Sequence, residues 1–109
     1  ESELASFFGT RHAVVCSSAS SALHLAYAAL GIGPESVGIV PAITFSATAN
    51  ALKYQSAKVI FCDVEPTTGL IDVNSLNQCL SKVSEEQKTK ANLITPVSFS
   101  GSAAPLDEC

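Results

Sequence analysis

Short apolar segments alternate with helical patterns along the chain, and this alternation limits the possible folds more than any other feature. The apolar segments cover residues 12–16, 37–40, 58–62 and 92–97. Apolar residues at helical spacing cover residues 3–8, 20–30, 47–55 and a stretch from a cap at Asp72 to Val83. Strands that are apolar throughout are typical of parallel sheets. The order predicts an α/β fold, a mostly parallel sheet with helices on both faces.

Polar and aromatic residues follow the predicted strands at the point where each strand ends. In chain order these are residues 17–21, 44–46, Asp63 and residues 98–101. Ligands of open α/β sheets bind outside the carboxyl ends of the strands. We therefore expect the ligand site of this chain at that edge of the sheet.

The first of these positions has the sequence CSSASSALHL, residues 16–25. A strand, a loop of small hydroxyl residues and a helix start make a site for anions, because the first helix amides have no internal partner and the helix dipole is positive there. Serine is also a favoured N-cap residue. The stretch alone is compatible with either a phosphate site or an ordinary helix cap.

Composition and charge exclude several classes of protein. The chain has 109 residues and a net charge of −4, and its six basic residues are scattered. A nucleic-acid-binding surface would be basic, so no nucleic-acid partner is expected. No apolar run is long enough to cross a membrane, and the acidic start does not resemble a signal peptide. We expect a protein of the cytoplasm.

The cysteine and histidine residues show no metal-site pattern. The four cysteines, at positions 16, 62, 79 and 109, are far apart and lack the paired spacing of a metal site. They are interpreted as buried or incidental thiols of a reducing compartment. His12 is interpreted as a solvated strand end and His24 as a structural residue. No metal site is predicted.

The chain contains no methionine, and residues 105–108 have the pattern of a helix start close to the last residue. We therefore expect an internal piece of a longer protein.

Four separated segments together resemble one family. They read HAVVCSSASSALHLAYAALGIGP, IVPAITFSATANAL, KVIFCDVEPTTGLID and ITPVSFSG. Their order and spacing resemble the DegT/DnrJ/EryC1/StrS family of pyridoxal-phosphate-dependent aminotransferases that act on nucleotide-linked keto-sugars. The resemblance covers residues 1–109. It implies the first portion of the cofactor-binding large domain of fold type I, a three-layer α/β/α architecture.

The resemblance also implies site residues. Ala19 and Ser20 stand where the family phosphate loop usually has Gly-Thr, and serine keeps a hydroxyl that can donate to the phosphate of pyridoxal phosphate. Phe45, which without the family would be interpreted as a core residue, matches the aromatic that stacks on the pyridine ring. Asp63 matches a family acid and is interpreted as organising its loop. Ser98 stands where many members carry histidine, so a role tied to that histidine is not carried over.

No catalytic residue is expected within these 109 residues. The family needs a lysine that binds the cofactor covalently and an aspartate beneath the pyridine nitrogen. In the family both follow the segment that resembles residues 97–101. The lysines present, at positions 53, 58, 82, 88 and 90, are interpreted as surface residues. The chain alone is therefore expected to be inactive.

Within the family, the SSASSAL sequence is most similar to enzymes that make 4-amino-4,6-dideoxy sugars for cell-surface polysaccharides or glycans. The resemblance implies a nucleotide-sugar substrate, an amino-acid donor such as glutamate and a homodimer in the full-length protein. Two alternatives remain open. One is a sugar dehydratase of the same superfamily, with histidine in place of the catalytic lysine. The other is a non-catalytic phosphate- or nucleotide-binding module.

Overall fold

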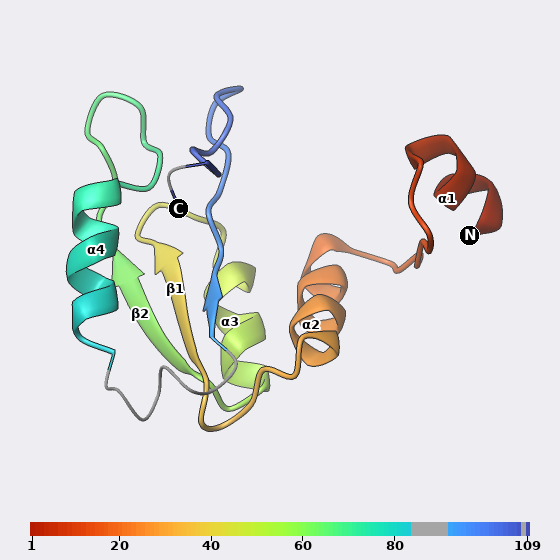
Figure 1. Cartoon of the computed structure of the whole chain (residues 1–109), viewed down its shortest axis with the longest axis horizontal. Coiled ribbons are helices and arrows are strands. Elements are labelled where there is room, and N and C mark those ends of the chain that lie inside the picture. The colour runs from red at the N-terminus through yellow and green to blue at the C-terminus, as the bar shows by residue number, and fades with distance from the viewer. Residues whose placement is uncertain (84–91, 108) are drawn as a thin grey trace.

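The computed structural model of the chain describes residues 1–83, 92–107 and 109. Four helices and three strands occur in these residues (Figure 1). In chain order they are α1 (Ser2–Phe8), α2 (Ala19–Ala29), β1 (Val37–Pro41), α3 (Ala47–Tyr54), β2 (Lys58–Cys62), α4 (Val73–Ser81) and β3 (Leu93–Ile94).

The three strands form one parallel sheet in the order β2-β1-β3. All five residues of the central strand β1 are buried. One edge of β1 pairs with β2, in a register that places Val37 beside Lys58 and Pro41 beside Cys62. The other edge of β1 pairs with β3. The predicted strands at 37–40 and 58–62 are confirmed. The predicted strand at 92–97 is confirmed only as the two residues of β3, although the Thr95 amide extends the ladder by donating to the Ile39 carbonyl at 3.0 Å.

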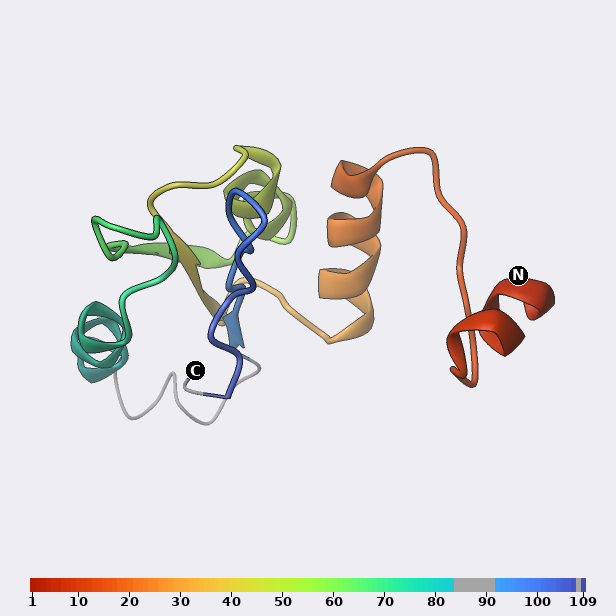
Figure 2. The same ribbon diagram turned by 90° about the horizontal axis from the view of Figure 1, so that it is seen from above.

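Helices cover both faces of the sheet, so the predicted α/β/α layering is confirmed (Figure 2). Successive residues of β1 point to opposite faces, as strand geometry requires. Val40 packs with Leu52 of α3 and Tyr27 of α2, whereas Ile39 packs with Leu76 of α4 on the other face. The core of the molecule therefore consists of two clusters separated by β1.

The strand predicted at residues 12–16 is absent, and this prediction was wrong. The segment is an irregular connection between α1 and α2, in which Val14 and Val15 are 73% and 60% exposed. A strand is stabilised by ladder bonds to a neighbour. Both edges of β1 are occupied by β2 and β3, and no described strand lies beside residues 12–16. An apolar run without a partner strand stays irregular.

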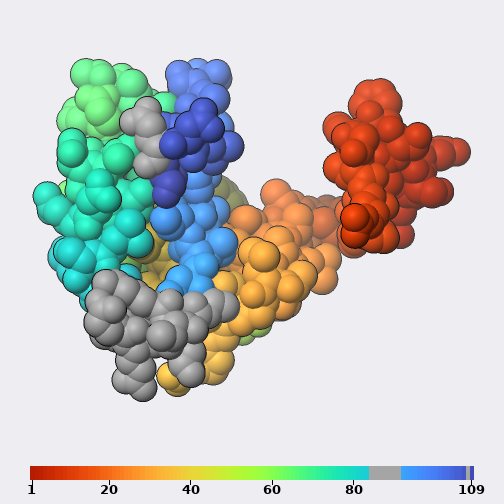
Figure 3. Space-filling model, viewed as in Figure 1, coloured from red at the N-terminus to blue at the C-terminus, as the bar shows by residue number. Residues whose placement is uncertain are grey.

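Both ends of the chain extend beyond the sheet. Helix α1 confirms the helix predicted at 3–8 and ends at Gly9, whose φ of 64° suits glycine. Figures 1 and 3 show α1 as a separate lobe, away from the sheet. The helix start predicted at residues 105–108 is not found, since residues 105–107 contain only a turn, and residue 108 lies outside the described residues. None of the helices in the described parts of the chain is long and apolar enough to span a membrane.

Candidate cofactor site

The first turn of α2 is closed by a serine cap. Ser18 has an extended backbone, and its Oγ accepts a hydrogen bond from the Ser21 amide at 3.2 Å. The Ser18 carbonyl accepts from the Ala22 amide at 3.0 Å, and the Ser18 and Ser21 hydroxyls lie 3.0 Å apart. The cap, one of the two interpretations of this stretch, is therefore present.

The cap leaves two amides at the helix start available. Among the described residues, no hydrogen-bond acceptor is found for the amide of Ala19 or of Ser20. Both residues are exposed to solvent. The unpaired amides and the positive end of the helix dipole coincide here. The helix cap and an anion site are therefore compatible with each other at this position.

Phe45 lies in the loop between β1 and α3, and its side chain is 77% exposed. The loop is held on both sides of this ring. The Ala42 amide donates to the Cys62 carbonyl at 2.8 Å, and the Thr48 amide donates to the Phe45 carbonyl at 3.0 Å. The hydroxyl of Thr44 lies 2.9 Å from that of the buried Thr48. An exposed aromatic ring on a fixed loop can contact a flat ligand, and Phe45 does not belong to the core.

Asp63 begins the loop from β2 to α4. Its amide donates to the Ser75 hydroxyl at 3.0 Å, and its carbonyl accepts from the Asp72 amide at 3.0 Å. Asp72 caps α4 as predicted, with its side chain accepting from the Asn74 amide at 2.9 Å. The backbone of Asp63 thus organises this loop.

The same loop contains a carboxylate held by local donors. The Glu65 side chain accepts from the amide and hydroxyl of Thr67 and from the Thr68 amide. These bonds, with the Thr67 hydroxyl as the largest contributor, lower the pKa of Glu65. The carboxylate of Glu65 therefore stays ionised to a lower pH than an isolated glutamate, with its charge held by donors of its own turn.

The loop after β3 packs against the loop after β2. Phe99 and Ser102 form an isolated antiparallel bridge, and the Ser98 hydroxyl accepts from the Ala104 amide at 3.2 Å. A Cβ atom on Gly69 would lie 2.7 Å from Phe99, so the phenylalanine ring lies against the glycine backbone. Sequence reasoning missed this contact. The only signal for it was a glycine in one turn and an aromatic residue in another.

These segments lie at one end of the sheet. Figure 1 shows the loops after β1 and β2 and residues 98–102 beyond the carboxyl ends of the strands, with the start of α2 level with these ends and to one side of the sheet. Helix α2 contacts α3, the helix that follows the Phe45 loop. The predicted gathering at one edge is confirmed for the segments after β1, β2 and β3. The start of α2 lies level with this edge, but the strand expected before residue 17 is absent.

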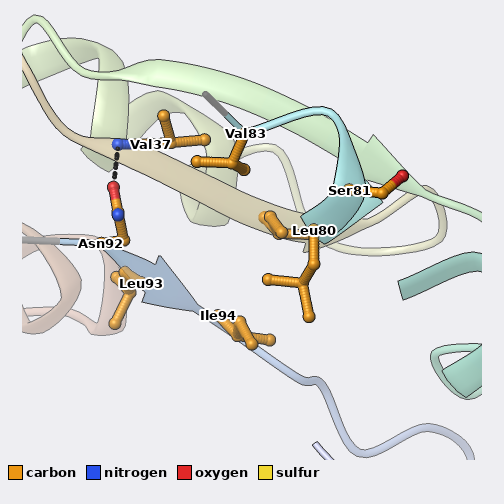
Figure 4. A pocket seen from close by; sticks show the side chains of 8 residues that line it. Val37, Leu80, Ser81, Val83, Asn92, Leu93 and Ile94 are labelled. Carbon is orange, nitrogen blue, oxygen red and sulfur yellow. Dashed lines mark hydrogen bonds between the residues drawn. The ribbon is translucent and has the colours of Figure 1, made fainter. Parts of the chain in front are cut away.

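An apolar cavity of about 440 Å³ lies elsewhere, between α4 and the starts of β1 and β3 (Figure 4). Its polar groups belong to Ser81 and Asn92, and Asn92 accepts a hydrogen bond from the Val37 amide at 2.9 Å. The apolar residues of its wall are Val37, Ile39, Leu80, Val83, Leu93 and Ile94. The cavity lies toward the amino ends of the strands and does not contain the predicted site residues.

The part of the chain that the structure describes contains no cluster of three or more residues suited to hold a metal ion. Cys62 and Cys79 are buried, Cys16 is half-buried and Cys109 is exposed, and none of them is in a disulfide. His24 lies on α2 with its ring 5.6 Å from that of Tyr54 on α3, a contact between helix surfaces.

A family model matches the chain over its whole length, residues 1–109. The chain belongs to the DegT/DnrJ/EryC1/StrS aminotransferase family. One relative of this family is the UDP-4-amino-4,6-dideoxy-N-acetyl-beta-L-altrosamine transaminase of Campylobacter jejuni, which is 42% identical over 108 residues. That alignment covers 99% of this chain and 27% of the relative.

Solved structures of other proteins share the fold. The structure of 3-amino-5-hydroxybenzoic acid synthase superposes with a TM-score of 0.82 at 29% identity, covering 99% of this chain and 26% of that protein. NtdA of Bacillus subtilis, solved with bound cofactor PMP, superposes with a TM-score of 0.79 at 26% identity. That superposition covers 96% of this chain and 22% of NtdA. The chain has the α/β fold of these proteins and spans about a quarter of their length.

Proposed function

We propose that the chain is the first portion of the large domain of a pyridoxal-phosphate-dependent enzyme that transfers an amino group to a nucleotide-linked keto-sugar. Membership of the aminotransferase family supports this proposal. The observation that carries it is the available amide pair of Ala19 and Ser20, level with the edge of the sheet that bears Phe45. These residues fit the cofactor in two separate respects.

The first respect is charge. The phosphate of pyridoxal phosphate is an anion, and the start of α2 offers two amides and the positive end of a helix dipole. Ala19 and Ser20 have side chains small enough for a phosphate to approach the backbone. Ser20 adds a hydroxyl donor. We assign the phosphate to these two residues.

The second respect is shape. The pyridine ring is flat, and the ring of Phe45 is exposed on a loop that three hydrogen bonds hold. Stacking of one aromatic ring on another adds about 0.5–1.5 kcal/mol to their burial. We assign Phe45 to the face of the pyridine ring.

The cofactor, when bound, supplies the electron sink that allows an amino group to be moved between carbon atoms. The residues of this chain hold and orient it and carry out none of the proton transfers. Of the lysines in the described residues, Lys53 lies in the last turn of α3, while Lys58 and Lys82 lie at element ends, and all three are exposed. We therefore propose that the 109-residue chain alone does not transaminate.

We assign a UDP-linked 4-keto-6-deoxy sugar as substrate and glutamate as donor. The sugar is supported by the Campylobacter jejuni relative, which is named as the transaminase of a UDP-4-amino-4,6-dideoxy sugar, the product that amination of such a keto-sugar would give. The donor rests on the family resemblance. We further propose that the complete protein is a cytoplasmic homodimer.

The test uses the complete gene product in which this chain occurs, supplied with pyridoxal phosphate, glutamate and a UDP-4-keto-6-deoxy sugar. We expect one 2-oxoglutarate to appear for each amino sugar detected by mass spectrometry. Loss of water from the sugar without consumption of glutamate would instead support the dehydratase alternative. Binding of pyridoxal phosphate without any change in the sugar would support the non-catalytic alternative.

A second measurement tests the inactivity of the 109-residue chain. The chain alone is mixed with pyridoxal phosphate and reduced with borohydride. We expect no single lysine to become specifically labelled, and specific labelling of one lysine would overturn this part of the proposal.

A further inference from the structure

Two cysteines are buried together between β2 and α4, where the proposed cofactor site makes no use of them. Cys62 is the last residue of β2 and has no exposed surface, and Cys79 lies in α4 and is 3% exposed. Both belong to one core cluster with Ile39, Ile71 and Leu76. Figure 1 shows α4 packed alongside β2.

Each thiol reaches across the interface to the other element. The Cys79 Sγ lies 3.6 Å from the carbonyl oxygen of Phe61, the residue before Cys62. The Cys62 Sγ lies 3.6 Å from the carbonyl oxygen of Asp72, which caps α4. The two thiols are also close enough to interact with each other directly.

The electrostatics of Cys62 agree with this arrangement. Burial raises the pKa of the Cys62 thiol, and the neighbouring Cys79 thiol raises it further, against a lowering by the Ser75 hydroxyl. A protonated thiol is a poor nucleophile. Oxidation of this pair is therefore expected to be slow and to need an oxidant small enough to reach the interface.

We propose that Cys62 and Cys79 form a dithiol that hydrogen peroxide converts into a disulfide joining β2 to α4. One thiol loses its proton, and its sulfur attacks one peroxide oxygen; the S–O bond forms as the O–O bond breaks, and the departing hydroxide takes up the proton, which gives a sulfenic acid and one water. The second sulfur then attacks the first, the S–S bond forms and a second water leaves. Two thiols are oxidised and one peroxide is reduced, so the step is balanced.

The bond would tie the end of β2 to α4 directly beside Asp63. It would thereby fix the loop that borders the carboxyl edge of the sheet. The inference concerns a modification site and does not depend on the proposed function.

The chain offers a direct measurement of this bond. Trypsin cleaves after Lys58 and Lys82, and the peptide of residues 59–82 contains both cysteines. The native protein is treated with hydrogen peroxide, quenched, alkylated in denaturant and digested. We expect this peptide to lose two hydrogen atoms and to resist alkylation, and dithiothreitol should reverse both changes. The circular dichroism spectrum of the treated protein should match that of the untreated protein.

Internal and variant controls accompany the measurement. The tryptic peptide of residues 12–53 contains Cys16 alone and should remain open to alkylation or oxidise without forming an internal bond. In Cys79→Ala, the peptide of residues 59–82 should keep one alkylatable thiol, and Cys62→Ala serves in its place if Cys79→Ala does not fold. The proposal would be overturned if both thiols of the wild-type peptide were still alkylated. It would also be overturned if they became sulfinic acids or if Cys62 paired with another peptide.

Discussion

At the scale of single residues, Gly38 on β1 determines how closely α3 can approach the sheet. A Cβ atom at this position would lie 2.3 Å and 2.5 Å from the two terminal methyl carbons of Leu52. Leu52 has no exposed surface and lies in the core cluster, so its side chain could move only by repacking against buried neighbours. Overfilling a packed core typically costs about 1–3 kcal/mol.

We therefore expect Gly38→Ala to lower the free energy of unfolding by about 1–3 kcal/mol, measured by urea denaturation. Gly33→Ala is the matched control, because nothing lies within 4 Å of its Cβ position and its φ is not positive. Equal stability of wild type and Gly38→Ala would show that α3 can move away from the sheet at little cost.

Tyr27 makes the free energy of unfolding sensitive to pH in the alkaline range. It is 3% exposed, and its hydroxyl lies 3.0 Å from that of Thr95. Burial raises its pKa above the ordinary value of 10.0, against a lowering by the Thr95 hydrogen bond. The unfolded chain then loses the phenolic proton at a lower pH than the folded chain. This contribution to stability is complete below pH 10 and is lost as the pH rises through the raised pKa.

We therefore expect the free energy of unfolding of the wild type to decrease above about pH 10 more steeply than that of Tyr27→Phe. Urea denaturation at a series of pH values measures the difference. Tyr54→Phe, at a side chain that is 64% exposed, should keep the steeper decrease. Identical pH profiles of wild type and Tyr27→Phe would contradict this role of Tyr27.

The residue-level predictions succeeded where a local rule was sufficient. Asp72 as the cap of α4 depends on residues two positions apart, and the structure confirms it. Ser46 directly precedes the helix predicted at 47–55 and occupies the cap position of α3, but its side chain makes no capping bond. The bond between Tyr27 and Thr95 joins residues 68 positions apart, and no local pattern indicates it.

At the scale of elements, the cap of α2 can be tested separately from any ligand. The Ser18 hydroxyl accepts from the Ser21 amide, whereas the Ser46 hydroxyl at the start of α3 accepts from no amide in its helix. Loss of a serine cap typically costs about 1 kcal/mol.

We expect Ser18→Ala to lower the free energy of unfolding by about 1 kcal/mol and Ser46→Ala to change it by less than about 0.5 kcal/mol. Thermal denaturation without cofactor measures both variants. Equal losses in the two variants would mean that the Ser18 hydroxyl does not stabilise α2.

Strands were the elements that sequence reasoning placed least well. Residues 37–40 and 58–62 became strands because each has a neighbour along its whole length. Residues 12–16 are equally apolar but have no neighbour, and residues 92–97 have β1 as a neighbour at only part of their length. Apolar composition shows that a segment can be buried, but strand formation also requires a partner that lies elsewhere in the sequence.

At the scale of the whole molecule, large apolar side chains remain exposed. Phe7 is 82% exposed, Phe8 68%, Val14 73% and Phe61 60%. Phe7 and Phe8 lie together on α1, with their rings 5.0 Å apart. Among the described strands, β2 and β3 each have one unpaired edge. Exposed apolar patches and free sheet edges favour association.

We therefore expect the 109-residue chain, produced alone, to associate with itself as its concentration rises. Sedimentation velocity measures this, and the double variant Phe7→Ser/Phe8→Ser should associate less. The double variant Ser2→Ala/Ser6→Ala changes polar positions of the same helix and should associate like the wild type. A chain that stays monomeric at all concentrations would contradict this expectation.

The layered architecture and the polar edge were predictable because they follow from the order of elements along the chain. The family was predictable from four sequence segments that match it in order and spacing. The separation of α1 from the sheet could not be predicted, since it depends on which surfaces α1 can contact. The role of Ala19, Ser20 and Phe45 stays a prediction.

The affinity for pyridoxal phosphate tests that role most directly. In the complete protein, stripped of cofactor and titrated by equilibrium dialysis, Ser20→Asp places a carboxylate where the phosphate is assigned. Like charges at close range cost several kcal/mol, so we expect the affinity to fall by about 100-fold or more. Ser2→Asp makes the same change in the first turn of α1 and should bind like the wild type. A Ser20→Asp variant that binds within about twofold of the wild type would contradict the assignment of the phosphate to the start of α2.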